Sequence, residues 1–518
     1  AMEKCTRDFI DGIADPIFRN QIIEKCSEGY RVLSYLRLHY GILEQSDVLT
    51  SLLSIAVMGI AVMGLRLVSD EHFSGSIGRL SSFFRLTPSL SAATLIAFSS
   101  GTRDFLFSAA AGAADETPGV VLGFLVAGFV FSSTLIVGNV LHRSHSRKLK
   151  VPKAPFIKEL STYGFTIGLL FFWGSVGSIG SFWVFVYFAL YVTYLIASLM
   201  LREESRDEII AEKIQETFSG EDLISKEEVI QSLAHSSPSG ENRFKRSSFL
   251  LRKSVWNFED SKPLNVILMP LRAAFVVSIP NENLFASTEK SPAVKTFIYL
   301  VKLLSSSISL FTALKSLTNL NGLPCFYISL APPFFIIFSS VSPRLAPVEA
   351  RLLLALNFLG ALGVAQFFAG FAVDSVTIFG FIFEWDRWFM NTIILSAVNS
   401  LMDYFLLGAL SDMGNETMAY LSGFASQTFK LLVVFFVHLL RRKSDDFDVF
   451  GFQSPTLTNE HFGLRSIFAF GGFSIVAHSF VAFSFWFSFP SGYKIVLFFL
   501  YFLFFMFCLV NVLIRYSY

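Results

Sequence analysis

Charged residues are scarce in this chain of 518 residues. Asp, Glu, Lys and Arg together make up 16% of it, whereas a soluble globular chain contains about 25%. The shortage excludes a disordered chain, a collagen-like chain and an ordinary cytosolic protein. Positive and negative charges nearly cancel, with a formal net charge of +1. The charge balance therefore implies no nucleic acid or other polyanion as a partner.

Cysteine is also scarce. The four cysteines are too few for a disulfide scaffold, and no two of them form a CxxC motif. Cys5 and Cys26 precede the first long hydrophobic run. They could form a disulfide if this end of the chain lies outside the cytosol, and they would be free thiols on a cytosolic tail.

Catalytic motifs are absent from the sequence. It has no HExxH, no GxSxG and no phosphate-binding loop, and its histidines lack the spacing of metal ligands. We therefore expect neither an enzyme nor a bound cofactor. No basic segment followed by an apolar one stands at the start, so no signal peptide is visible.

Hydrophobic residues, by contrast, make up 53% of the chain, and 61 residues are Phe. They come in blocks of about 20 residues, the length of a helix that crosses about 30 Å of hydrocarbon. The sequence therefore predicts an all-α polytopic membrane protein whose partner is the lipid bilayer. The predicted spans are 48–68, 88–112, 118–141, 158–178, 181–201, 294–314, 324–341, 349–376, 388–411, 416–440, 465–488 and 491–514.

The spans form two sets of five around a polar middle, with two extra spans ahead of the second set. We expect the charged part of the middle to be a regulatory loop or an inert linker. The predicted order is an N-terminal cap (1–46), a first set of helices (47–201), the charged loop (202–262), an interfacial helix with two extra spans (263–345), and a second set of helices (346–518).

Basic residues predict the orientation of the chain. The loop after the third span holds five of them, so the positive-inside rule assigns this loop to the cytoplasmic or matrix side. The N-terminal cap is then external, and loop 202–262 is internal. The five basic residues are Arg143, Arg147, Lys148, Lys150 and Lys153.

The direction of the second set depends on segment 263–282. Three prolines make this segment a poor span, so we expect it to lie at the membrane interface. The two sets are then inverted repeats. If 263–282 spans instead, the repeats are parallel, which suits the basic run 441–443 better. We predict the inverted version, because three aspartates that follow this run dilute its charge.

Two carboxylates lie where hydrocarbon makes them costly. Asp104 falls in span 88–112 and Asp403 in span 388–411. A carboxylate in mid-membrane costs about 2.5–3.5 kcal/mol on insertion scales, and such residues usually face a cavity, a partner or an ion. Each follows a small polar cluster that can break a helix. The clusters are Ser99, Ser100 and Thr102 in one case, and Ser396, Asn399 and Ser400 in the other.

These two clusters predict an ion site. Carboxylate, hydroxyl, amide and carbonyl oxygens suit Ca²⁺ or Na⁺. Two broken helices in matching positions of two halves are typical of a transporter with an inverted repeat. For either aspartate alone, a polar contact between helices or at a helix end is the alternative.

The two clusters resemble motifs of the cation/calcium exchanger superfamily, above all of its mitochondrial-type sodium/calcium exchanger branch. That branch carries Gly-Asn-Gly-Ala-Pro-Asp in the first repeat and Gly-Asn-Ser-(Ile/Leu)-Gly-Asp in the second. The matching positions here read Ser-Ser-Gly-Thr-Arg-Asp over 99–104 and Val-Asn-Ser-Leu-Met-Asp over 398–403. Further similar stretches lie at 26–30, 86–98, 140–201, 262–280 and 379–383, and the resemblance covers most of the chain except the middle loop.

The resemblance implies ten core helices in two inverted repeats, with alternating access that exchanges Ca²⁺ for Na⁺. It implies the mitochondrial inner membrane or an endomembrane rather than the plasma membrane. It also implies roles for individual residues. Asp104 and Asp403 would be the principal ion ligands, Ser100, Thr102, Asn399 and Ser400 auxiliary ligands, and Asp374 a peripheral residue or a hinge contact.

Two cations depart from the family pattern. Arg103 stands where the family has proline, and Lys430 stands where relatives have Asn or Asp. Arg103 could point away from the ion, and Lys430 could extend to the membrane interface. Either could also replace one Na⁺ as a built-in cation, or abolish Ca²⁺ transport. Three functions stay open: a Na⁺/Ca²⁺ antiporter, an antiporter coupled to H⁺ or another cation, and a relative that does not transport.

Overall fold

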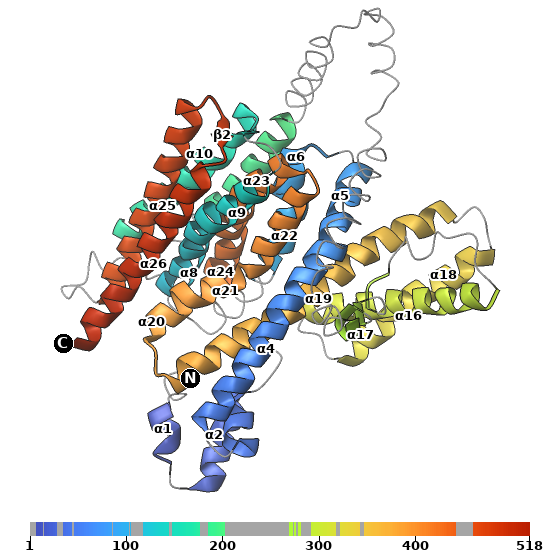
Figure 1. Ribbon diagram of the computed structural model, residues 1–518, viewed down its shortest axis with the longest axis horizontal. Coiled ribbons are helices and arrows are strands. Elements are labelled where there is room, and N and C mark those ends of the chain that lie inside the picture. The colour runs from blue at the N-terminus through green and yellow to red at the C-terminus, as the bar shows by residue number, and fades with distance from the viewer. Residues whose placement is uncertain are drawn as a thin grey trace, which may run out of the picture.

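The computed structural model describes the helical parts of the chain (Figure 1). The predictions for Cys5, Arg103, loop 202–262 and the charged segment 442–458 concern residues outside those described. The described residues are 7–13, 15–27, 35–43, 46–84, 86–102, 104, 118–144, 148–176, 185–201, 269–272, 274–275, 278–280, 292–317, 322–341, 346–441 and 459–517.

Long apolar helices dominate the fold. In lipid every backbone N–H and C=O group must find its partner within the protein, and a helix provides this along its whole length. Within the described ranges, seven helices are long and apolar enough to cross a membrane, which confirms the prediction of a polytopic helical membrane protein. They are Asp47–Phe83, Val121–Arg143, Arg351–Ile382, Thr392–Asp412, Glu416–Leu440, Gly463–Ser484 and Tyr493–Leu513.

Two helical rods of 37 residues each pack against one another along the molecule (Figure 1). One rod starts as α4 (Asp47–Val68), continues through the π-helical segment η3 (Ser69–Phe73) and ends as α5 (Ser74–Phe83). The other rod is α19 (Ala346–Ile382). Each rod opens one of the two predicted sets of helices.

The two rods run in opposite directions. Arg7 donates hydrogen bonds to the carboxylate of Asp47 at 2.9 Å and to the carbonyl of Ile382 at 3.0 Å, so the start of α4 lies beside the end of α19. The guanidinium carbon of Arg351 lies 5.5 Å from the centre of the Phe83 ring, so the start of α19 lies near the end of α5. The first helices of the two sets are therefore antiparallel, as the inverted arrangement requires.

A pair of short strands agrees with this arrangement. Strand β1 (Lys148–Lys150) precedes α10, and strand β2 (Ser488–Pro490) precedes α26. They pair antiparallel, with Leu149 opposite Phe489. The loops that precede α10 and α26 therefore lie at the same end of the bundle. Numbered as core helices, without the extra helices of the middle, α10 is the fourth and α26 the tenth. Parallel repeats would place these two loops on opposite sides of the membrane.

The third and eighth helices share one internal pattern. Each consists of an α-helix of 14 residues, a π-helical segment of 5 and a final α-helix of 7. π-Helical segments in α-helices occur often at functional sites. The pieces are α8 (Pro118–Phe131), η5 (Ser132–Ile136) and α9 (Val137–Arg143), and α23 (Glu416–Phe429), η9 (Lys430–Val434) and α24 (Phe435–Arg441).

The second and seventh helices, which carry the predicted ligands, are also interrupted. In both, a π-helical segment precedes the polar cluster. The second contains α6 (Pro88–Ser91) and η4 (Ala92–Ile96) and stays helical to residue 102; the seventh contains α20 (Arg387–Phe389), η8 (Met390–Ile394), α21 (Leu395–Asn399) and α22 (Leu401–Asp412).

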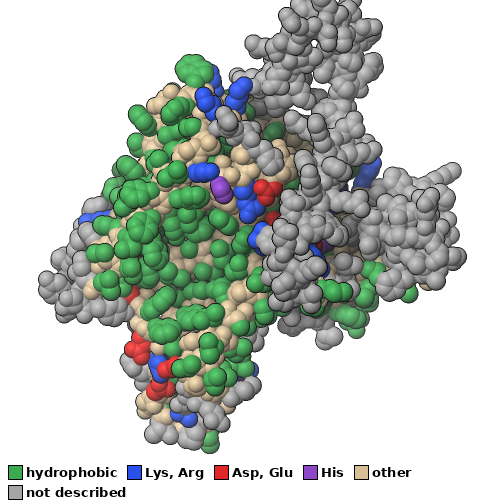
Figure 2. All heavy atoms as spheres, viewed as in Figure 1, with side chains coloured by type: hydrophobic (Ala, Val, Ile, Leu, Met, Phe, Trp, Pro, Cys, Tyr) green, Lys and Arg blue, Asp and Glu red, His purple; other side chains and the backbone are tan. Residues whose placement is uncertain are grey.

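Four outer helices cover the interrupted helices. Those near the chain end have many exposed aliphatic and aromatic side chains, and Figure 2 shows the broad hydrophobic surface they form. Such a surface suits contact with lipid. The four are α10 (Lys153–Val176), the helix Phe185–Leu201, α25 (Asn459–Ser484) and α26 (Tyr493–Ser517).

The middle of the chain adds three helices on the far side of α19 (Figure 1). They are α16 (Pro292–Leu317), α17 (Gly322–Ser329) and α18 (Ala331–Val341). Span 324–341, predicted as continuous, is divided at Leu330, because the two prolines that follow have no N–H to continue a helix. The described residues between 269 and 280 form only short helical turns.

A small N-terminal cap joins the two rods at one end. Tyr35, which is fully buried, forms a hydrogen bond of 2.9 Å with Ser375 of α19. Cys26 is disulfide-bonded, whereas Cys325 and Cys508 are free. The cap consists of α1 (Arg7–Asp11), α2 (Pro16–Ser27), α3 (Tyr35–Arg37) and the π-helical segment η2 (Leu38–Ile42).

Gly64 permits the close approach of the two rods. A Cβ atom at this position would lie 2.5 Å from the Phe368 ring of α19. We predict that Gly64→Ala lowers stability by about 1–3 kcal/mol through overpacking. Gly59→Ala on the same helix is the control, because nothing lies within 4 Å of its added Cβ. Thermal unfolding in detergent should separate them, and an equal loss in both would contradict this account.

His39 should make the cap sensitive to acid. Burial lowers the pKa of His39 below its ordinary value of 6.5, although Asp47 opposes this. The folded cap therefore holds a neutral imidazole, and the unfolded cap takes up a proton first as the pH falls. We predict that protease resistance of the cap declines below about pH 6.5. His39→Gln should remove this pH dependence; a decline that persists in the variant would assign it to another group.

Candidate ion site

Asp403 lies directly after the break in the seventh helix. The break is Ser400, whose backbone N–H donates to the carbonyls of Ser396 and Ala397, both at 3.1 Å. Helix α22 then begins at Leu401, and Asp403 lies in its first turn. The unpaired N–H groups at a helix start favour a negative charge there. The polar cluster before Asp403 therefore positions the carboxylate as well as interrupting the helix.

Lys430 bridges the carboxylates of the two halves. Its ammonium nitrogen, Nζ, lies 3.1 Å from Oδ2 of Asp104 and 3.0 Å from Oδ2 of Asp403. Lys430 is 3% exposed, Asp104 2% and Asp403 3%. The alternative in which Lys430 extends to the membrane interface is therefore wrong. Its side chain instead ends between the two carboxylates that the sequence predicts as ion ligands.

The three charged groups form a partly compensated cluster. Two carboxylates and one ammonium leave one negative charge. A buried carboxylate without a partner is strongly destabilising, and charge-assisted hydrogen bonds offset that cost. The ammonium thus occupies the place between two carboxylates where a free cation would be held by the same attraction.

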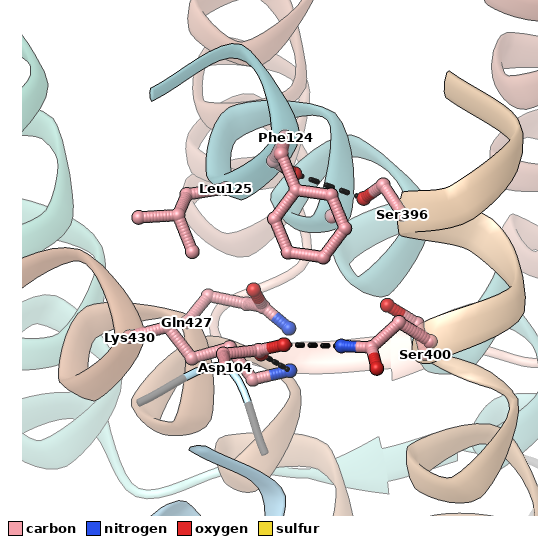
Figure 3. Close-up of a pocket in the computed structure, with 9 residues that line it drawn as sticks. Asp104, Phe124, Leu125, Ser396, Ser400, Gln427 and Lys430 are labelled. Carbon is pink, nitrogen blue, oxygen red and sulfur yellow. Dashed lines mark hydrogen bonds and ion pairs between the residues drawn. The ribbon is translucent and has the colours of Figure 1, made fainter. Parts of the chain in front are cut away.

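Asn399 and Ser400 complete the polar side of a small cavity beside this cluster (Figure 3). The amide Nδ2 of Asn399 donates a hydrogen bond to Oδ1 of Asp104. The seventh helix of one half is thereby bonded to the second helix of the other. The cavity is lined by Asp104, Phe124, Leu125, Gly128, Ser396, Asn399, Ser400, Gln427 and Lys430.

Gly128 leaves part of this cavity open. A Cβ atom there would lie 3.1 Å from Oγ of Ser396, 3.6 Å from Oε1 of Gln427 and 3.9 Å from Oγ of Ser400. Three side-chain oxygens from two helices therefore surround a point that any other residue would fill. Gln427 is 2% exposed, and its Nε2 has no hydrogen-bond partner within the described part of the chain. We refer to this point as the Gly128 notch.

The other predicted site residues lie elsewhere. The Thr102 hydroxyl donates to the carbonyl of Phe98 at 2.6 Å, within its own helix. Ser100 is buried, and its Oγ has no partner among the described residues. Asp374 is buried next to Ser375, which contacts the cap, and it does not line the cavity.

The two halves differ at matching positions. Lys430 is the first residue of η9, and Ser132 is the first residue of the corresponding segment η5. Ser132 donates a hydrogen bond of 2.8 Å to the carbonyl of Gly423 and carries no charge. On the Lys430 side, the Phe429 ring fills the space that a Cβ atom of Gly101 would need. Of these two matching segments, only η9 therefore supplies a cation to the centre.

Gln427 and Gly128 are among the cavity residues that were not predicted as ligands. Gln427 lies in a run of small and polar residues, Ser-Gln-Thr at 426–428, that also suits helix packing. Gly128 lies in an apolar helix that also contains glycine at 119 and 123. Neither pattern indicates a side chain directed at an ion, because the notch arises only where the third, seventh and eighth helices meet.

Comparison with known proteins finds partial similarity to exchangers. No family model matches the chain. Cation/calcium exchanger 2 of Arabidopsis thaliana is 26% identical over 135 residues, which is 25% of this chain and 24% of the relative. Cation/calcium exchanger 1 of the same plant is 26% identical over 176 residues, 33% of this chain and 30% of the relative.

The comparisons found two further similarities. The mitochondrial sodium/calcium exchanger protein of Rattus norvegicus is 22% identical over 156 residues, 30% of this chain and 26% of the relative. The sodium-calcium exchanger NCX_Mj, a solved structure, is 12% identical, with 88% of this chain and 97% of that chain covered and a TM-score of 0.41. The matches thus span about a quarter to a third of the length of these curated exchangers, and the chain is similar to them over that part.

Loss of the Lys430 ammonium should make stability depend on added cations. We predict that Lys430→Gln lowers the free energy of unfolding by about 3–5 kcal/mol in salt-poor buffer, because two buried carboxylates lose their partner. Added Na⁺ or Ca²⁺ should restore much of the loss by binding the folded state. Thermal unfolding in detergent, titrated with each chloride salt, measures both effects.

Lys158→Gln is the matched control. Lys158 is also buried and lies 2.6 Å from the carboxylate of Glu159, which is fully buried in α10. Its loss removes one ammonium from one carboxylate, away from the cavity. We expect it to destabilise without recovery on adding cations. Equal recovery in both variants would show that the cations act on the whole protein and not between Asp104 and Asp403.

Proposed function

We propose that the protein is a cation antiporter whose ion site lies between Asp104 and Asp403, with Lys430 as a tethered cation. One observation carries this proposal: the ammonium of Lys430 lies within 3.1 Å of a carboxylate from each half. An arrangement that holds an ammonium between two carboxylates also suits a metal cation of similar charge. The relatives, which are named as cation/calcium and sodium/calcium exchangers, support the same class of function.

The charge of the cluster favours a singly charged cargo. With Lys430 in place, Asp104 and Asp403 retain one negative charge between them. At about 5 Å and an effective dielectric constant near 20, Ca²⁺ and the ammonium repel by about 6–7 kcal/mol. That corresponds to more than about four decades of affinity. Altered coupling therefore fits the site better than unmodified Na⁺/Ca²⁺ exchange.

The Gly128 notch gives a singly charged cation a place beside the ammonium. The oxygens of Ser396, Ser400 and Gln427 surround it, and Asp104 lines the same cavity. Hydroxyl and amide oxygens with one carboxylate suit a hard cation. No group of three His, Cys, Asp or Glu side chains that could hold a metal ion occurs in the described residues. We therefore propose Na⁺ as a transported ion, with Ca²⁺ entering only when Lys430 withdraws.

Transport into proteoliposomes tests this proposal. We predict that the wild-type protein exchanges radioactive Na⁺ against unlabelled Na⁺, and that its Na⁺-driven Ca²⁺ uptake is weak. Asp104→Asn and Asp403→Asn should each lower Na⁺ exchange by at least about tenfold, because the remaining carboxylate is fully compensated by Lys430. Lys430→Asn should raise the affinity for Ca²⁺, because it removes the competing charge.

Lys158→Gln serves again as the control. Its Na⁺ exchange and its Ca²⁺ uptake should both equal those of the wild-type protein. Strong Ca²⁺ uptake by the wild type that Lys430→Asn does not increase would contradict the role of Lys430. Na⁺ exchange undiminished in the two aspartate variants would contradict the site. A folded wild-type protein that moves neither ion would favour the alternative that this protein is a relative of the exchangers that does not transport ions.

A further inference from the structure

A strained aromatic turn stands at the β1–β2 end of the bundle. Trp486 and Phe487 are consecutive residues with positive φ, 53° and 59°. This left-handed backbone is unusual for bulky residues, and such strain is often retained where it serves a function. Phe487 is 5% exposed, whereas Trp486 is 74% exposed. The turn thus directs the Trp486 ring out of the protein and the Phe487 ring into it.

The surrounding structure holds this turn in place. The backbone N–H of Phe487 donates to the carbonyl of Ala482 at 2.7 Å, and its carbonyl accepts from the N–H of Val151 at 3.0 Å. The adjacent β1–β2 pair buries Leu149 and Phe489. Trp486 therefore cannot fold inward without breaking hydrogen bonds at the junction of the two halves.

Trp486 also continues a stripe of lipid-facing side chains. Its exposed neighbours along α25 recur every three or four residues, which places them on one face of the helix. Tryptophan at the end of such a face usually lies among lipid headgroups. The stripe consists of Phe473, Val476, Phe480 and Phe483, which are 58%, 63%, 71% and 65% exposed.

Basic side chains gather around the turn. The ammonium of Lys153 lies 4.2 Å from the centre of the Trp486 ring, and Lys148 of β1 is exposed. Lys494 forms a hydrogen bond of 3.1 Å with His142. Segments 144–153 and 485–494 contain no acidic residue. Figure 2 shows Lys and Arg side chains at this end of the molecule, next to the hydrophobic surface.

We propose that this turn and its lysines form a binding site for the phosphate of an anionic phospholipid. Ammonium groups bind phosphate, and the indole anchors the site at headgroup depth. The orientation predicted from the basic loop puts the site at the cytoplasmic or matrix leaflet, where anionic lipids make the membrane surface negative. Because β1 and β2 belong to different halves, the bound lipid holds both halves at one level of the membrane.

Lipid retention in nanodiscs tests the site. The full chain is placed in phosphatidylcholine nanodiscs with a graded fraction of phosphatidylglycerol, and the lipids retained after release are counted by native mass spectrometry. We expect the wild-type protein to retain phosphatidylglycerol preferentially. Lys148→Gln/Lys153→Gln should weaken this retention by about tenfold, because each ammonium near an anionic lipid contributes to binding.

The control removes two exposed basic residues from the opposite end. Lys25→Gln/Arg37→Gln changes the net charge equally and alters only the cap. If this control weakens retention as much, the effect is general electrostatics and the site is refuted. Equal retention of both lipids by the wild-type protein also refutes it. Displacement of the lipid by soluble glycerol phosphate would indicate a site for a soluble phosphate and refute the lipid assignment.

A second measurement applies if the double variant does not fold. Phosphatidylglycerol spin-labelled near its headgroup should quench the fluorescence of Trp486 more than labelled phosphatidylcholine does. Comparing the wild type with Trp486→Phe isolates this signal. Trp385→Phe is the control, because Trp385 is 43% exposed in the loop after α19, beside the cap. Equal quenching by the two lipids would overturn the proposal.

Discussion

The contact of one ammonium with two carboxylates organises the centre of this protein. Asp104 comes from the first half, Asp403 from the second, and Lys430 joins them at about hydrogen-bond distance. Three buried charges in a membrane would each be costly alone, and together they leave one unit of charge to balance. Interrupted helices, the bond from Asn399 and the open space at Gly128 are all arranged around this cluster.

The surrounding frame keeps the two halves in register. The antiparallel rods α4 and α19 cross where Gly64 admits the Phe368 ring, and the cap joins their ends through Tyr35 and Arg7. At the opposite end of the bundle, Arg143 of α9 forms an ion pair of 2.7 Å with Asp412 of α22. The rods are thus joined at the cap, and α22, which carries Asp403, is joined to α9 at the opposite end.

Much of this arrangement follows from sequence patterns. Blocks of apolar residues predict the helices, because lipid leaves the backbone no other partner. The small polar clusters before Asp104 and Asp403 predict two carboxylates in matching positions, and the structure brings them to one ammonium. Their role as ion ligands stays a prediction. The two prolines after Leu330 indicate a break in this span, but hydropathy is averaged over many residues and does not reveal it.

Other features depend on distances that no local pattern encodes. Lys430 lies in a helix whose burial cannot be judged without its neighbours, so an interfacial lysine and a central one have the same sequence signature. The Gly128 notch exists because Ser396, Ser400 and Gln427 approach it from two other helices. The strained turn at Trp486 and Phe487 follows from the pairing of strands about 340 residues apart, Lys148–Lys150 with Ser488–Pro490.

The difference between Lys430 and Ser132 has a consequence for the membrane as a whole. An inverted repeat relates the two faces of the bilayer, so two identical halves would make inward-open and outward-open states mirror equivalents of equal energy. A charge present in η9 and absent from η5 removes that equivalence. For the antiporter proposed above, the two orientations therefore differ in energy even without an ion gradient, and one of them is preferred at rest.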